Sequence, residues 1–379
     1  MENDFAVIVG LQHYPAIDDP ANGKPPLSGP ENDANDFNRW ILCPNGGNVP
    51  KQNVKLILSS DYLPVLAPDF SNAKPAELDI VAAFEKLRKI SITNIDRGLG
   101  SRIGRRLYIF MSGHGISPTP FGTKIGKETG LLMSNVDPTN IGAPRYHIPG
   151  TYTATWFCEN DCFEEVFLFM DCCRDIAIVS SSNTYLPPKG NSETSKKFFA
   201  FATRWSRRSR EKLFDGRMQG IFTKTLIMAL EGACAEPDPN DPTNGVITGA
   251  SLKSFLYRNM KKFIDPDFIN DLQGQEPDID YFPKADEGRD IVIRTGVPLA
   301  QFPLLINIPT SVTGVIEMVD GRFSSVINNP VKIDQQQMQL ALPVGVYLLL
   351  YTSNGIPNKI RVEINGMETA GNETIVNLN

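Results

Sequence analysis

Cysteine is scarce in this chain, with six residues in 379. Two of the six are adjacent, which does not suggest a disulfide scaffold, so we expect reduced thiols and a cytoplasmic setting. Long apolar runs are also lacking, and since a spanning helix needs about 18 such residues, no membrane span is expected. The first residues are acidic where a secretory signal needs positive charge, so we expect no signal peptide. The net charge of −6 argues against nucleic acid as an obligate partner.

Two apolar segments each end in a reactive side chain. Residues 106–115 (RLYIFMSGHG) and 166–175 (VFLFMDCCRD) are each typical of a buried parallel strand. This places His114 and Cys173 at strand carboxyl ends, where open α/β sheets carry their active sites. An imidazole near a thiol can accept its proton or pair with the thiolate, which gives a nucleophile suited to acyl transfer. The pair predicts a cysteine peptidase.

The N-terminal three quarters of the chain alternates strand and helix patterns, which predicts an α/β fold with a mostly parallel sheet flanked by helices. Ser28 and Glu31 have the spacing of a capping box at the start of a helix. The polar stretch 116–162 is expected to hold a short hairpin, and the polar, Pro-bearing stretch 180–197 a loop. Further strands are expected at residues 5–11, 54–58 and 198–203, and further helices around Ile80, Phe222 and Leu252.

From about residue 298 the pattern changes to short runs separated by Gly, Asn or Pro. Several runs alternate apolar and polar residues and none shows a helical period, so a small all-β sandwich of about 80 residues is predicted. This region contains no sequence pattern that we recognise as catalytic or ligand-binding, and we expect it to have a stabilising or partner-binding role. The six runs are 304–308, 315–319, 338–342, 346–351, 360–364 and 374–378.

The order of several motifs resembles that of caspase-like peptidases. The His and Cys segments are accompanied by residues 5–11 (FAVIVGL), 27–34 (LSGPENDA), 220–232 (GIFTKTLIMALEG) and 275–277 (QEP). The pattern is more similar to metacaspases and their bacterial relatives than to animal caspases, and covers about residues 1–290. The resemblance implies a caspase-like domain over residues 1–296, followed by the sandwich over 297–379. Within the first domain it implies a large-subunit-like part (1–179), a linker (180–197) and a small-subunit-like part (198–296).

The resemblance also implies roles at the reaction centre. Alignment on Asp171 makes Cys173 the nucleophile, whereas Cys172 takes the position of a family serine and should point to the opposite face of the strand. A swap of the two cysteines stays open as an alternative. The backbone amides of Gly115 and Cys173 would form the oxyanion hole. Asp175 stands where the family has glycine, which is a departure in the loop after the nucleophile.

Two acids set the expected specificity. In metacaspases the residues corresponding to Asp33 and Asp171 line the pocket for the substrate side chain before the cleaved bond. Two partly desolvated carboxylates attract a guanidinium, so cleavage after Arg, and less strongly Lys, is expected. Each acid also has a plain structural explanation, Asp33 in the first turns of a helix and Asp171 at a strand end. The resemblance also implies that Arg204 and Trp205 line the substrate groove.

Processing and metal binding are less specified. Cleavage at a basic residue, by the enzyme itself or by an upstream activating protease, is one expectation, and a solvated charged segment is the other. The processing candidates are Lys189, Lys196, Lys197, Arg207, Arg208 and Arg210. No cofactor is expected to be required; a Ca²⁺ site at residues 236–241 and a zinc site at Cys158, Cys162 and His147 are weaker alternatives.

Two other functions stay open. The chain could be a catalytically silent caspase-like scaffold that binds a partner through its C-terminal domain, or an active peptidase that cuts after Asp or an apolar residue. The expected partner is a protein or peptide substrate. The physiological substrate and the oligomeric state are not encoded in any pattern that we recognise.

Overall fold

The computed structural model of the chain forms two compact units. The first comprises Met1–Ile227 and Met260–Ile291, and the second Met228–Asn259 and Val292–Asn379. The predicted domains, residues 1–296 and residues 297–379, have other bounds than these units and stay a prediction. The structure describes all residues except 1–3, 63–69, 119–127, 138, 141–142, 175–185, 187–189, 191, 193, 206, 242, 266–274, 282–290, 314, 321–324, 327–330, 333–335 and 370–371.

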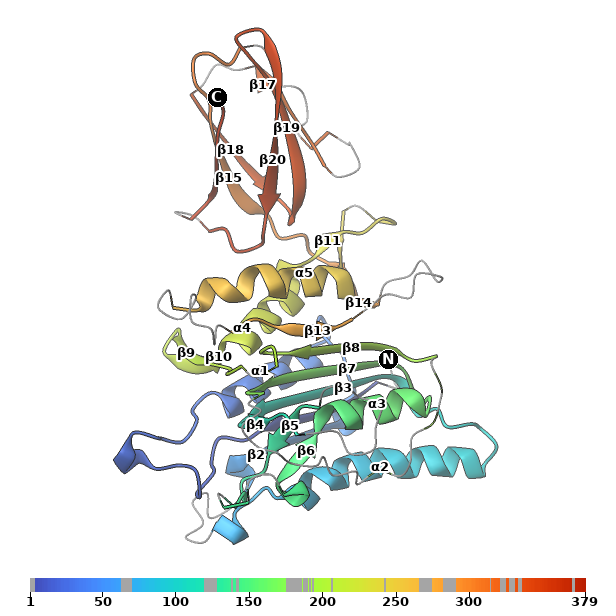
Figure 1. The fold of residues 1–379 in the computed structure, drawn as a ribbon. Coiled ribbons are helices and arrows are strands. Elements are labelled where there is room, and N and C mark those ends of the chain that lie inside the picture. The colour runs from blue at the N-terminus through green and yellow to red at the C-terminus, as the bar shows by residue number, and fades with distance from the viewer. Residues whose placement is uncertain are drawn as a thin grey trace. The chain divides into compact units, whose positions relative to one another are not determined.

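A six-stranded sheet is the centre of the first unit, with the strand order β13-β8-β7-β3-β1-β2 (Figure 1). Five strands run parallel, and β13 pairs antiparallel with β8 at one edge. The predicted α/β class with a mostly parallel sheet is therefore confirmed. The strands are β1 (Phe5–Gly10), β2 (Val54–Leu58), β3 (Gly104–Gly113), β7 (Phe163–Cys172), β8 (Lys196–Phe201) and β13 (Asp278–Asp280).

Helices cover both faces of this sheet. On one face α1 (Pro30–Leu42) stacks Phe37 on Phe110 of β3, with ring centroids 4.7 Å apart. On the other face lie α2 (Glu77–Asp96) and α3 (Gly150–Glu159) (Figure 1), whose buried side chains belong to the same apolar core as Met111 of β3. Successive strand residues point to opposite faces, so a strand that is covered on both sides needs apolar residues at every position. This is why β3 and β7 are continuous apolar runs in the sequence.

The stretch between β3 and β7 holds more structure than the predicted hairpin. It forms a three-stranded sheet of β4 (Gly115–Ile116), β5 (Gly130–Leu132) and β6 (His147–Pro149), followed by α3. The prediction missed α3 because eight of its ten residues are buried. A helix that is buried on nearly all sides has no polar face and therefore no apolar period.

A second hairpin follows β8. It consists of β9 (Glu211–Phe214) and β10 (Arg217–Gly220), and leads into α4 (Ile221–Met228). The turn residues Asp215 and Gly216 both have positive φ, 51° and 79°, as a two-residue turn of the type favoured by Asp-Gly requires. The sequence analysis did not identify this hairpin, although it expected the helix after it.

The second unit contains α5 (Gly249–Asn259) and three small sheets. A π-helical turn (Ala229–Ala233) leads to a sheet of β11 (Glu236–Pro237), β12 (Gly245–Thr248) and β14 (Val292–Val297). Two further sheets, β18-β15-β21 and β17-β16-β19-β20, share one apolar core, so the predicted all-β region is confirmed (Figure 1). Their strands are β15 (Phe302–Asn307), β16 (Val315–Val319), β17 (Val331–Lys332), β18 (Gln337–Leu342), β19 (Gly345–Ser353), β20 (Ile356–Ile364) and β21 (Thr374–Asn377).

The remaining helical segments are short 3₁₀ turns. Within the described parts of the chain, no helix combines the length and apolar character that crossing a membrane requires. The 3₁₀ turns are Pro20–Asn22, Lys51–Asn53, Ser59–Asp61, Phe70–Asn72, Pro144–Tyr146 and Met260–Phe263.

Candidate active site

Strands β3 and β7 end at the same edge of the central sheet (Figure 1), and His114 and Cys173 are the residues that directly follow them. The last residues of the two strands, Gly113 and Cys172, are register partners in neighbouring parallel strands. The turns that follow are in contact, because a β-carbon built on Gly115 would lie 2.3 Å from the carbonyl oxygen of Cys173. Only glycine permits this approach, so the two turns lie as close together as their backbones allow.

His114 is largely withdrawn from solvent. Burial lowers the pKa of its imidazole to about 4, because the charged form is poorly solvated there. The imidazole is therefore neutral at neutral pH and can accept a proton. Its backbone N–H donates to the hydroxyl of the fully buried Tyr14 over 2.9 Å, and the two rings meet edge to face with centroids 4.7 Å apart.

The two adjacent cysteines differ in environment. Cys172 is 1% exposed and belongs to the apolar core, where burial raises the pKa of its thiol well above the ordinary value. Cys173 is partly exposed, and its Sγ lies 3.9 Å from the carbonyl oxygen of Ser209. Because a thiolate is the nucleophilic form and must be reached by substrate, Cys173 has the more suitable position of the two.

Asp33 and Asp171 are both buried, and the carboxylates of both lie against the backbone of Gly220. A β-carbon built on Gly220 would lie 1.9 Å from Oδ2 of Asp171 and 3.0 Å from Oδ2 of Asp33. Burial raises the pKa of both carboxyl groups, and for Asp33 the charge of Asp171 raises it further. Among the residues that the structure describes, no Lys or Arg forms an ion pair with either aspartate.

Neutral donors hold these two carboxylates in place. Asp33 accepts hydrogen bonds from the N–H of Gly220 (3.0 Å) and the hydroxyl of Ser112 (2.9 Å). Asp171 accepts from the hydroxyl of Ser209 (2.6 Å), and from the hydroxyl (2.7 Å) and N–H (3.0 Å) of Thr223. These donors are all uncharged, so they fix the positions of the two carboxylates without contributing a positive charge.

A third acid, Glu211, lies beside this pair and was missed by the sequence analysis. It is the cross-strand partner of Gly220 in the β9–β10 hairpin. Its carboxylate accepts from the backbone N–H groups of Ser28 and Gly29, each over 3.2 Å, and burial raises its pKa. Ser28 and Glu211 are 183 positions apart in the sequence, so no local pattern could have indicated their contact.

The predicted capping box at the start of α1 is wrong. The helix begins at Pro30 with Gly29 as its N-cap, and no side chain caps it. Pro30 fixes the helix start one residue later than the box requires. Glu211 instead binds the amides at this end, and Glu31 accepts from the N–H of Ser60 over 2.7 Å.

The predicted groove residues Arg204 and Trp205 lie in the segment after β8. Arg204 is exposed and forms an ion pair with Glu276 (2.7 Å). The Trp205 ring lies 5.3 Å from the guanidinium of Arg174, a buried residue directly after Cys173. Arg174 also donates its backbone N–H to the carbonyl of Arg207 over 3.0 Å, which connects this segment to the turn that carries Cys173.

The processing candidates have different environments. Lys189 lies outside the described residues, whereas Lys196 and Lys197 form the start of β8 and pair with β7, so they are not in the loop predicted for residues 180–197. Arg208 is exposed. The backbone of Arg210 accepts from the N–H of Ile221 (3.1 Å) and donates to the side chain of Gln275 (3.1 Å).

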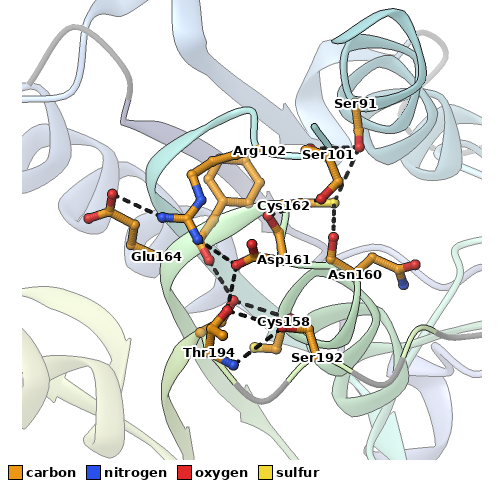
Figure 2. A network of polar contacts seen from close by, with 12 residues as sticks. Ser91, Ser101, Arg102, Cys158, Asn160, Asp161, Cys162, Glu164, Ser192 and Thr194 are labelled. Atoms are coloured by element: carbon orange, nitrogen blue, oxygen red, sulfur yellow. Dashed lines mark hydrogen bonds and ion pairs between the residues drawn. The ribbon is translucent and has the colours of Figure 1, made fainter. Parts of the chain in front are cut away.

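The weaker metal alternatives gain no support. Within the described ranges, no group of three or more His, Cys, Asp or Glu side chains could hold a metal ion. Cys162 instead lies in a polar network in which its Sγ is 3.7 Å from the hydroxyl of Ser91, and Asp161 binds Arg102 over 2.6 Å (Figure 2). His147 is fully buried on β6, and among the described residues no partner meets hydrogen-bond geometry at either ring nitrogen.

Comparisons with known proteins place this site in context. No protein-family model matches the chain. A probable protease from a Desulfuromonadales bacterium is 27% identical over 241 residues, which cover 61% of this chain. The match spans about a quarter, 26%, of that relative's length. This similarity agrees with the resemblance to peptidases that the motifs indicate.

Two solved structures are similar at lower levels. A structural-genomics protein from Geobacter sulfurreducens aligns with a TM-score of 0.42 and 13% identity, over 75% of this chain and 96% of its own. Caspase-1 from Spodoptera frugiperda aligns with a TM-score of 0.40 and 15% identity, over 77% of this chain and 92% of its own.

Proposed function

We propose that this chain is a cysteine endopeptidase in which Cys173 is the nucleophile and His114 is its general base. The backbone contact between Gly115 and Cys173 supports this proposal, because it joins the two segments that carry the imidazole and the partly exposed thiol at the carboxyl edge of a parallel sheet. The sequence similarity to a probable protease supports the peptidase class.

The proposed reaction has two steps. In the first, the Cys173 sulfur attacks the scissile carbonyl carbon while His114 takes the thiol proton. The N–H groups of Gly115 and Cys173 donate to the carbonyl oxygen as it gains negative charge. The carbon–nitrogen bond then breaks, His114 returns the proton to the leaving amine, and a thioester remains on Cys173. In the second step a water molecule gives its proton to His114 and attacks the thioester, which releases the carboxylate product and the thiol.

We propose that the residue before the cleaved bond is Arg, with Lys second. Asp33 and Asp171 lie buried side by side, and no described Lys or Arg forms an ion pair with either. A guanidinium offers five N–H donors in a planar fork and loses less hydration energy than an ammonium, so it suits two adjacent carboxylates better. Burial raises the pKa of both aspartates, and the charge of Asp171 raises that of Asp33 further, so without a bound cation protonation of one of them relieves the repulsion.

Processing and cofactors belong to the same proposal. Arg208 is the exposed member of the basic cluster that follows Trp205, so it is the site we propose for any maturing cleavage, by the enzyme itself or by an upstream protease. We propose that the reaction needs no cofactor, because the thiol, the imidazole and the backbone amides supply nucleophile, base and oxyanion donors.

Matched fluorogenic peptides that end in Arg, Lys, Asp or Leu test the proposal. Hydrolysis should be fastest after Arg, absent in Cys173→Ala and retained in Cys172→Ala. Cys172→Ala should mainly lower the melting temperature, since it removes a buried sulfur from the core. Faster cleavage after Asp or Leu would contradict the acidic pocket. Loss of activity in Cys172→Ala with retention in Cys173→Ala would reverse the cysteine roles. If the intact chain hydrolyses none of the peptides and is not labelled by a peptide electrophile, a binding scaffold would be favoured.

A further inference from the structure

Tyr14 lies in the segment after β1 and is held rigidly at its backbone. Its N–H donates to the carboxylate of Asp18 over 2.8 Å, and its carbonyl accepts from the N–H groups of Ile17 (2.7 Å) and Asp18 (2.8 Å). The side chain is completely buried. The position of its hydroxyl is therefore set by the fold and does not depend on a mobile loop.

The Tyr14 hydroxyl occupies the space beside the peptide unit that joins β3 to His114. A β-carbon built on Gly113 would lie 2.4 Å from the Tyr14 hydroxyl oxygen, and Gly113 has φ of 152°, which side chains rarely adopt. The Tyr14 hydroxyl lies where a side chain on Gly113 would be, and there it accepts a hydrogen bond from the N–H of His114 over 2.9 Å. The His114 backbone thus has a fixed partner outside the sheet.

The Tyr14 ring also restricts the imidazole. The two rings meet at 64° with centroids 4.7 Å apart, an edge-to-face arrangement that packs one side of the His114 ring. One side chain therefore contacts both the backbone and the ring of the same histidine.

These contacts have consequences for two catalytic groups at once. Tyr14 holds the backbone N–H of His114. Two proposed catalytic groups are attached directly to this residue: its own imidazole, and the peptide unit that ends in the N–H of Gly115. A misplacement of about 1 Å in such a group can lower a rate on the order of a hundredfold. We propose that Tyr14 is a positioning residue that sets the orientation of the His114 imidazole and of the Gly115 amide; this inference rests on the proposed function of His114 and Cys173.

The pH dependence of Cys173 alkylation tests this role without a substrate. Iodoacetamide would be applied to the full chain between pH 5 and 9, with modification of Cys173 followed by tandem mass spectrometry. The variants are His114→Ala, Tyr14→Phe and, as the matched control, Tyr108→Phe. Tyr108 is also buried, and its hydroxyl lies 3.3 Å from Arg106, but its ring packs on Trp40 and Phe167, away from the site.

We expect His114→Ala to shift the alkylation profile to higher pH, because the thiolate loses the imidazolium that forms when His114 takes the thiol proton. Tyr14→Phe should shift it in the same direction and slow alkylation near pH 7 on the order of tenfold. Tyr108→Phe should follow the wild-type profile even if its melting temperature falls equally. On the Arg reporter, Tyr14→Phe should lower kcat and leave KM unchanged, as expected when ground-state binding is intact.

The outcomes separate the two hypotheses. If His114→Ala leaves the profile unchanged, the proposed dyad fails and the positioning role fails with it. If only His114→Ala shifts the profile, the dyad stands and the Tyr14 proposal is overturned. Should Tyr14→Phe not fold, Asp18→Ala decides, because it loosens Tyr14 without touching His114; a wild-type profile in that variant overturns the proposal and a shift to higher pH supports it.

Discussion

Asp33→Asn isolates the charge of the proposed specificity pocket from its shape. The carbonyl oxygen of the new side chain can still accept from the N–H of Gly220, and its amide can donate to the hydroxyl of Ser112. Loss of one partner from a buried, hydrogen-bonded charge pair costs about 2–5 kcal/mol. We therefore expect kcat/KM for an Arg reporter to fall on the order of a hundredfold, which corresponds to about 2.8 kcal/mol.

The assay compares this reporter with one that carries citrulline, which has nearly the shape of Arg but no charge. Cleavage after citrulline should change little in Asp33→Asn. Asp36→Asn is the matched control, because Asp36 lies one turn further along the same helix and is also buried, but is paired with Arg39 and Arg217. The control should leave the Arg-to-citrulline ratio unchanged. An equal loss on both reporters, or the same ratio change in the control, would refute the charge argument.

The same substitution should alter the pH dependence of folding. Because the pKa of Asp33 is raised in the folded state, the stability associated with its protonated form is fully present below the unfolded pKa of about 3.9 and is lost as the pH rises through the folded pKa. Because asparagine does not titrate, Asp33→Asn removes this pH-dependent loss of folding stability. Urea unfolding at a series of pH values above 4 should therefore show a weaker decline for the variant than for the wild type.

Three further predictions concern the site and its surroundings. Gly115→Ala places a methyl group 2.3 Å from the carbonyl oxygen of Cys173, so it should separate the two turns and lower kcat on the order of a hundredfold; near-normal turnover would show that their contact is dispensable. Burial lowers the pKa of His147 from 6.5 to about 4, so folding stability should fall as the pH drops between these values, and His147→Leu should reduce that fall in urea unfolding. Activity on the Arg reporter should be the same with EDTA and with Ca²⁺, as hydrolysis rates would show; a Ca²⁺-dependent rise would point to a metal site outside the described residues.

The strands that carry the site could be predicted because burial on both faces leaves a continuous apolar run. The runs that end near His114 and Cys173 correspond to β3 and β7, and of the two adjacent cysteines Cys172 is buried and Cys173 partly exposed. The all-β region was predictable for a related reason, since alternation at period two marks strands with one buried face, as in β20.

What could not be predicted depends on contacts between distant segments. Glu211 binds the N-terminus of α1, and Tyr14 binds His114 across 100 residues, and neither contact leaves a local pattern. The capping box failed because Ser28 and Glu31 matched a local rule that Pro30 and a distant carboxylate overrode. The helix α3 was missed because burial on nearly every side removes the periodicity by which helices are identified.

The hydrogen bond from Gly220 to Asp33 joins residues 187 positions apart, which gives the site an order of assembly during synthesis. Cys173 and His114 leave the ribosome before Gly220 and Thr223, whose amides hold the two aspartates. At about 5–20 residues per second, roughly 2–10 s separate the synthesis of Cys173 from that of Gly220. During this interval the nascent chain carries the proposed nucleophile and base but not the backbone that holds the two aspartates, so under the proposed function the specificity pocket forms only after the reactive groups have been made.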